Sequence, residues 1–300
     1  MTAGAGLVQR AAALMAQGQR DAATQLLSSH LAQDPGDGKA WFYLGRIYLD
    51  EAYRWHRAGH PDSVSAPMLL DFASTSFEPA QQLLADSGGV FRALVAVERA
   101  TLRIERDGWP AAAAIDLPAE DVPLPPVMAE LGRNLLASCP RNGVLVTGGL
   151  PETAAAWGLR LQGERRDLIL IRADMFDWDS RYRAGMDSIL GAADADHLAV
   201  ALSHAAATRA ICLGPSVDTL TVPGVTWTPA RLVLTSAAAP VAGPALSVFH
   251  FGRTGLAGSV WTASVRDIYD LAARRNPALC RSLFVDSDAL TLPAIPACGP

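Results

Sequence analysis

The sequence predicts a mixed α/β protein in which an all-helical N-terminal third precedes a larger α/β region. Apolar residues recur at helical spacing through the first third, and short β-branched runs alternate with helical patterns from residue 143 onward. The 300 residues suit two modest domains, and a hydrophobic content of 50% provides for large cores. An Ala- and Pro-rich stretch at 111–126 is typical of an extended connector. We therefore expect domains at 1–110 and 127–300, the second with an irregular C-terminal extension.

The first third contains two helix-turn-helix patterns and a final helix. Residues 7–31 have helical spacing with an interruption at Gly18, and a second unit begins near Trp41. Glycine and prolines at 58–67 predict an insertion inside this second unit. The amphipathic helix expected at 90–106 would cover the open end of the array.

Spaced residues in both units give the first resemblance to a known family. The second unit has the spacing W-x2-L-G-x2-Y at Trp41, Leu44, Gly45 and Tyr48. Residues 7, 11 and 14 fall at equivalent positions one period of roughly 34 residues earlier. The pattern of a second helix, A-x3-F-x2-A, occurs at Ala73, Phe77 and Ala80, and more loosely at Ala23, Leu27 and His30. This part of the chain resembles the tetratricopeptide repeat family, whose members bind proteins; the alternative is a generic pair of helical hairpins.

The resemblance implies a binding groove on the concave face of the helices. The residues expected to line it are Val8, Ala12, Met15, Phe42, Arg46 and Leu49. The face is mainly apolar and lacks a cluster of basic residues that would hold an acidic peptide terminus. We also expect Trp41 to be buried between the two repeats. The leading interpretation is therefore a non-enzymatic scaffold or assembly subunit with a protein partner.

The α/β region is organised around a strand, a helix and a second strand. Residues 143–147 form a short β-branched run, Gly148 and Gly149 interrupt it, and 151–161 has a helical pattern before the apolar run at 168–171. Two buried strands joined by a crossover helix predict parallel pairing.

Further elements are expected along the rest of the chain. The patterns predict helices at 182–190, 197–206 and 265–274, and strands at 210–213, 231–235 and 245–251. Alternating helices and strands favour a Rossmann-like three-layer domain with a mainly parallel sheet, whose strand order is not determined by the sequence.

A second resemblance rests on residues in this region. They are the run 138–149, Glu152, Thr153, Trp157, Gln162, Gly163, Arg165, the run 167–171, and later 209–213, Trp227, Pro229 and Leu232. This pattern is similar to the soluble tail of a bacterial membrane protein family of unknown function with a glycosyltransferase-like spanning region. The chain has Leu150 and Pro151 where that family's turn presents an acidic residue and Asn. The resemblance implies peripheral association with a membrane complex.

A second kind of function would use the ends of the strands. Gly148 and Gly149 resemble the opening of a nucleotide-binding turn, and Asp174, Asp177 and Asp179 follow the next strand with a D-x-D motif able to chelate a cation. These residues would form the cleft of a transferase or hydrolase acting on a nucleotide or sugar. However, no G-x-G-x-x-G pattern is present, and aspartates also cap helices. We therefore expect no catalytic residue, no metal and no cofactor.

The charge and the cysteine spacing argue against several classes of protein. The net charge is -5, and the single lysine, Lys39, and scattered arginines argue against nucleic-acid binding. The longest uncharged stretch, 232–252, contains two prolines and a polar middle, so no membrane span is expected. Four cysteines without C-x-x-C spacing are expected to be buried or incidental thiols. With no secretory signal visible, the expected location is cytoplasmic, with a periplasmic location as the alternative.

Overall fold

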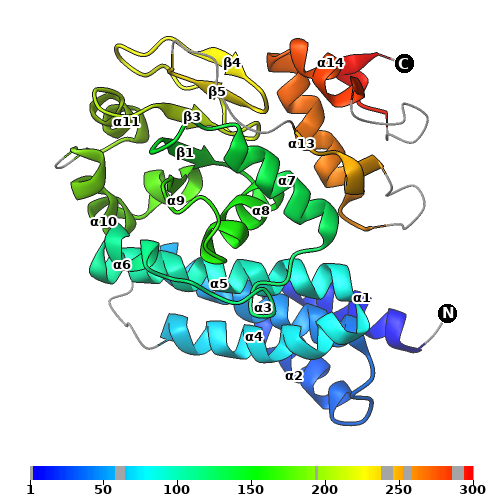
Figure 1. Cartoon of the computed structure of the whole chain (residues 1–300). Helices are drawn as coiled ribbons and strands as arrows, with labels where there is room; N and C mark the ends of the chain where they lie inside the picture. Colours follow the sequence, from blue (N-terminus) through cyan, green and yellow to red (C-terminus); the bar gives the residue numbers. More distant parts are fainter. Residues whose placement is uncertain are drawn as a thin grey trace. The chain divides into compact units, whose positions relative to one another are not determined.

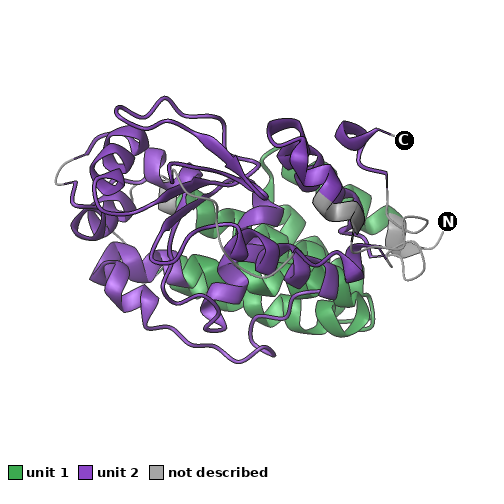
Figure 2. Ribbon diagram, turned by 45° about the horizontal axis from the view of Figure 1, so that its top comes forward, with its two compact units in different colours: residues 1–99 green, residues 100–300 purple. Residues whose placement is uncertain are grey.

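The computed structural model describes residues 3–57, 65–192, 195–237, 246–252, 259–285 and 294–299. The chain divides into two compact units, here named unit 1 (residues 1–99) and unit 2 (residues 100–300), which are coloured separately in Figure 2. The helix α5, Ala85–Asp107, runs across the division. Most of the expected insertion at 58–67 lies outside the described residues.

Unit 1 is helical throughout its described elements. Between the first two helices the chain turns at Gly18, whose φ of 75° is the left-handed conformation that glycine adopts most readily. The turn before α3 is held by the Asp37 carboxylate, which accepts the backbone N–H groups of Lys39 and Ala40 at 3.0 Å each. Besides α5, the helices are α1 Ala3–Ala16, α2 Arg20–Leu31, α3 Gly38–Arg57 and α4 Ser65–Leu83.

Unit 2 contains helices and one sheet (Figure 1). Its helices are α6 Trp109–Ala113, α7 Pro126–Ala137, α8 Leu150–Leu161, α9 Ala173–Trp178, α10 Ser180–Leu190, α11 Leu198–Ala206, α13 Thr262–Arg275 and α14 Ala278–Val285, with a 3-10 turn at Pro296–Cys298. Its strands are β1 Val144–Thr147, β2 Ile169–Arg172, β3 Ile211–Leu213, β4 Thr228–Ala230 and β5 Val233–Thr235.

The segment between α6 and α7 is attached to α8. The Leu117 N–H donates to the Leu161 carbonyl at 2.8 Å, and the Gln162 amide donates to the Val122 carbonyl at 2.7 Å. Val122 is fully buried. Part of the stretch that composition marks as a connector, around Leu117 and Val122, is therefore packed within unit 2.

The sheet is mixed, which corrects the prediction that it is mainly parallel. The strand order is β2-β1-β3-β5-β4; β1 pairs in parallel with β2 and β3, whereas β5 pairs antiparallel with β3 and β4. The pair β4–β5 is antiparallel because its connection is short, with Arg231 at a φ of 54°, whereas the pair β3–β5 joins residues far apart in the chain, such as Cys212 and Thr235. A turn as short as that from β4 to β5 joins only antiparallel strands, because a parallel pair requires a long crossover.

The strand expected at 245–251 is also wrong where it is described, because residues 249–252 are helical. The buried carboxylate of Glu130 on α7 accepts the backbone N–H groups of His250 (2.8 Å) and Phe251 (2.9 Å) and the Ser247 hydroxyl (3.0 Å). An acidic group that accepts several backbone N–H groups stabilises the start of a helical turn. Residue 245 lies outside the described residues.

The core of unit 2 lies around the parallel strands. Helix α8 packs on β1, α9 on β2 and α11 on β3, and α7, α8 and α13 pack against one another (Figure 1). The largest fully buried side chains of this unit include Trp157, Tyr182, Phe176 and Phe251. The strands β1, β2 and β3 are buried along their whole length, as the continuous apolar runs predicted.

Candidate functional site

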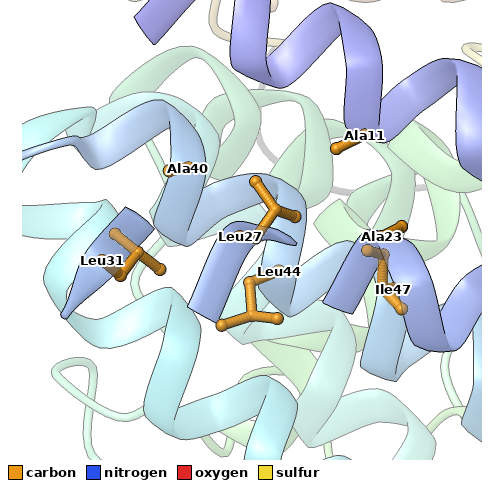
Figure 3. Close-up of a cluster of buried hydrophobic side chains, with 7 residues drawn as sticks. All are labelled: Ala11, Ala23, Leu27, Leu31, Ala40, Leu44 and Ile47. Carbon is orange, nitrogen blue, oxygen red and sulfur yellow. The ribbon is translucent and has the colours of Figure 1, made fainter. Parts of the chain in front are cut away.

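The repeat-like part of unit 1 has a compact apolar core. Small and aliphatic side chains from α1, α2 and α3 meet there, and Figure 3 shows them pointing toward one another. Leu27 is fully buried at the centre and Leu44 is nearly so. The cluster consists of Ala11, Ala23, Leu27, Leu31, Ala40, Leu44 and Ile47. Several of these positions belong to the repeat pattern, so the sequence spacing predicted packing residues correctly.

Gly45 shows why the pattern has a glycine at its place. A Cβ atom on Gly45 would lie 2.7 Å from the ring of Phe77 on α4, closer than real Cβ contacts allow. The glycine therefore allows the fully buried Phe77 ring to lie directly against the α3 backbone. Both residues belong to the predicted pattern, one on each helix of the second pair.

Trp41 is half-buried, which corrects the expectation that it is buried between the repeats. Its indole Nε1 donates to the Pro35 carbonyl at 2.9 Å, in the turn between α2 and α3. In the same turn, His30 Nε2 lies 3.0 Å from a carboxylate oxygen of Asp37. His30 departs from the small residue usual in the family pattern, and this contact gives it a polar partner at the end of α2.

The expected groove residues differ in exposure. Val8 and Leu49 are buried, Met15 and Phe42 are half-buried, and Ala12 and Arg46 are exposed. The Phe42 ring lies 4.9 Å from the Phe91 ring on α5 in an edge-to-face arrangement. The Arg46 guanidinium lies over the same Phe91 ring at 5.6 Å.

In unit 2, the expected cleft begins at the turn between β1 and α8. Gly149 has a φ of 63°, and a Cβ on Gly148 would lie 2.9 Å from the Ser216 carbonyl oxygen. Pro151 stands in the first turn of α8, where its missing N–H has no helical partner to lose. The two glycines are therefore required by backbone conformation and by close approach of a neighbouring turn.

Glu152 occupies the space beside these glycines. Its carboxyl group accepts the Gly148 N–H at 2.9 Å and the Ser216 N–H at 2.8 Å, and the side chain is fully buried. Burial raises the pKa of Glu152 to about 7, although the backbone N–H groups of Ser216 and Gly148, the Ser216 hydroxyl and the positive charge of Arg275 act in the opposite direction. The sequence analysis named Glu152 only within the second resemblance and gave it no role at this turn; its place three residues after a Gly-Gly turn was the signal.

The three aspartates of the expected cleft each have a structural contact. Asp174 accepts from the Arg172 guanidinium at 3.1 Å. Asp177 lies 3.4 Å from the Leu198 N–H at the start of α11. Asp179 caps α10, accepting the N–H groups of the helix residues 181 (2.8 Å) and 182 (3.0 Å). Within the described ranges, no group of three or more His, Cys, Asp or Glu residues is placed to hold a metal ion.

The cysteines correct the expectation of free thiols. Cys139 and Cys212 form one disulfide, and Cys280 and Cys298 form the other. The partners of the first bond are 73 residues apart in sequence, so no local spacing motif could have revealed the pairing. Cys139 follows α7 and Cys212 lies in β3, so this bond ties the sheet to the helix beside it.

The comparisons with known proteins apply to the start of the chain. Residues 5–47 match the family model of the tetratricopeptide repeat, which supports the first resemblance over these residues. Nothing among curated proteins or solved structures matches the chain, and the resemblance to a glycosyltransferase-like membrane family gains no support. No helix in the described part of the chain is both long enough and apolar enough to cross a membrane.

Proposed function

We propose that the chain is a non-enzymatic scaffold or assembly subunit that binds a protein partner through unit 1. The observation that carries the proposal is the match of residues 5–47 to a repeat family, together with the packing of α1, α2 and α3 around one apolar cluster. Tetratricopeptide repeats are interaction modules in which helices present an extended surface to a protein ligand.

The proposed contact face is the accessible part of the expected groove. Ala12 on α1 and Arg46 on α3 are exposed, and Met15 and Phe42 are half-buried beside them in the sequence pattern. Val8 and Leu49 are buried and act as packing residues in this proposal. An arginine over an aromatic ring is a frequent centre of protein interfaces, because the ring and the planar guanidinium bury area with little loss of conformational freedom.

Affinity purification with matched variants tests this face. The full-length tagged protein is used to capture proteins from the organism of origin, in parallel with Ala12→Arg and Arg46→Glu. We expect one partner to be captured about tenfold less by both variants, while their melting temperatures stay within about 2 °C of the unmodified protein.

Arg10→Glu is the matched control, because Arg10 is an exposed residue of the same helix as Ala12. It should capture the partner as the unmodified protein does. Equal capture by all variants, or equal loss with Arg10→Glu, would remove the support for this face.

In the described residues, the groups expected to form a transferase or hydrolase cleft at the strand ends make structural contacts instead. Asp174, Asp177 and Asp179 are engaged in the hydrogen bonds described above, and Gly148 and Gly149 form a turn filled by Glu152. We therefore do not propose this second function.

We further propose that the protein works in an oxidising compartment. All four cysteines are paired in disulfides, and such bonds persist outside the reducing cytosol. This supports the periplasmic alternative over the cytoplasmic location expected from the sequence. Titration of thiols in protein isolated from its native cells under alkylating conditions tests it: fewer than about 0.2 thiols per chain are expected, and about four would contradict the proposal.

A further inference from the structure

The parallel strands of unit 2 end side by side at a change in strand order. Strands β1 and β3 are parallel neighbours, and β2 lies on the other side of β1, so the chain reverses its direction of travel across the sheet between β1 and β3. In open α/β sheets, ligands bind in the crevice at the carboxyl ends of the strands at such a switch point. Anions are favoured there, because the N–H groups of the following turn and helix point at them.

In this chain, the carboxyl group of Glu152 fills the position at the strand ends that a ligand's anion would otherwise take. Glu152 stands in the first turn of α8 and reaches back to the N–H of Gly148, which follows β1. Its second oxygen accepts the N–H of Ser216, which follows β3. One side chain therefore satisfies donors from both turns that would otherwise surround a ligand's anion.

The turn after β3 is also held from its other side. The Arg275 guanidinium, at the end of α13, donates to the carbonyl oxygens of Gly214 (3.2 Å) and Val217 (2.7 Å). A Cβ atom on Gly214 would overlap a carboxyl oxygen of Glu152, so the backbone and the carboxyl group are in direct contact. Residues 214–217 are therefore held on two sides. Glu152 accepts the N–H group of Ser216, and Arg275 donates to the carbonyl groups of Gly214 and Val217.

We infer that the carboxyl group of Glu152 closes the strand-end crevice of unit 2 from within and locks residues 214–217 against β1. The crevice then binds no phosphate or nucleotide, because its donors are occupied by a side chain that is covalently present at a very high effective concentration. The glutamate is a positioning residue of the fold. This conclusion is independent of protein binding by unit 1.

Chemical rescue tests the inference. Glu152→Ala removes the atoms that acetate can replace, and it leaves the donors of Gly148 and Ser216 facing a polar cavity. At constant ionic strength and pH 7, replacing chloride with acetate should raise the melting temperature of this full-length variant by about 2–4 °C in a saturable way. Glu152→Gln fills the same volume, so its melting temperature should not rise in a saturable way with acetate. The unmodified protein should show no such rise either.

Amide hydrogen exchange provides the second measurement, which does not depend on the alanine variant folding. In the unmodified protein, the amides of Gly148 and Ser216 should exchange at least about tenfold more slowly than in Glu152→Gln, whereas the amides of β1 should not change. Equal exchange in the two proteins, or an equal acetate response of folded Glu152→Ala and Glu152→Gln, would overturn the inference.

Phosphate ligands provide the third readout. The unmodified protein should show no thermal shift with inorganic pyrophosphate or ADP beyond that of sodium chloride at equal ionic strength. A saturable shift that Glu152→Gln changes would overturn the inference, because it would show that the crevice accepts an external anion. None of these outcomes affects partner capture through unit 1, so the two proposals succeed or fail separately.

Discussion

The interiors of the two units differ in the kinds of side chain that they bury. In the described part of unit 1, the core is built from alanine, leucine and aromatic side chains, and the buried polar residues are few. Unit 2 buries several ionisable groups, including Glu130, Glu152, Arg160, Arg172 and Asp270. Buried charges cost free energy unless they have partners. Because unit 1 buries Glu98 whereas unit 2 buries several such groups, unit 2 depends more heavily on polar contacts than unit 1 does.

Two phenylalanines of α4 that differ in burial, Phe77 and Phe72, test how far the stability of unit 1 depends on apolar packing. Phe77→Ala should lower the free energy of unfolding by about 3–5 kcal/mol, because the ring is 0% exposed and lies against Gly45 and the Phe42 and Phe91 rings. Phe72→Ala, on the same helix but 46% exposed, should cost below about 1 kcal/mol. Urea unfolding measures both, and similar losses would mean that the predicted repeat core is not the stabilising one.

Removal of the disulfides tests the long-range connections of unit 2. In the loop-entropy model, Cys139→Ala with Cys212→Ala should cost about 4 kcal/mol, because the bond closes a loop with a sequence separation of 73. Cys280→Ala with Cys298→Ala, with a separation of 18, should cost about 3 kcal/mol. Chemical unfolding with and without reductant measures both. Unchanged stability of the first pair would show that its closure does not stabilise unit 2.

The pH dependence of stability tests the buried carboxyl group. The pKa of Glu152 is about 7 in the folded chain against 4.5 as its ordinary value, so the folded state holds the proton more tightly. Its contribution of about 3 kcal/mol is fully present below pH 4.5 and is lost as the pH rises through 7. Between pH 5 and 9, the unmodified protein should therefore lose stability relative to Glu152→Gln. If the free energies of unfolding of the two proteins change in parallel with pH, the prediction is contradicted. The positive charge that faces Glu152 and opposes the rise in its pKa is Arg275.

Trp41 gives the smallest expected effect. Trp41→Ala should lower the free energy of unfolding by about 1–2 kcal/mol, because the indole is half-buried and makes one hydrogen bond, to the Pro35 carbonyl. This loss is smaller than that expected for a fully buried aromatic residue. Trp41→Phe retains the ring area and removes the donor, so about 1 kcal/mol is expected. A loss above about 4 kcal/mol for Trp41→Ala would mean that the indole carries the repeat packing after all.

The sequence predicted local features far better than distant ones. The helical repeat pattern is local, so the positions of Leu27, Leu44 and Gly45 follow from spacing alone. The strands β1, β2 and β3 were predicted for the same reason. The antiparallel edge and the pairing of Cys139 with Cys212 depend on residues far apart in the chain, which periodicity does not report.

The candidate sites show the same division. The D-x-D motif suggested metal binding, but Asp179 caps α10, and the Asp177 carboxylate, in α9, lies 3.4 Å from the Leu198 N–H at the start of α11. The cap preference of aspartate also predicted the role of Asp179. Ser216, which donates to Glu152 from the turn after β3, is 64 residues away, so no motif around the Gly-Gly turn includes it. A buried acid becomes recognisable only when its distant donors are known.

The helix α5 has a consequence for the history of such chains. Because Ala85–Asp107 spans the division at residues 99 and 100, an exon boundary or a recombination point placed there would cut a helix and damage both products. Modules that shuffle freely between genes are joined by loops that tolerate new neighbours. For a chain with a helix through the division we therefore expect relatives to carry both units together, and changes in one unit to be accompanied by changes along α5.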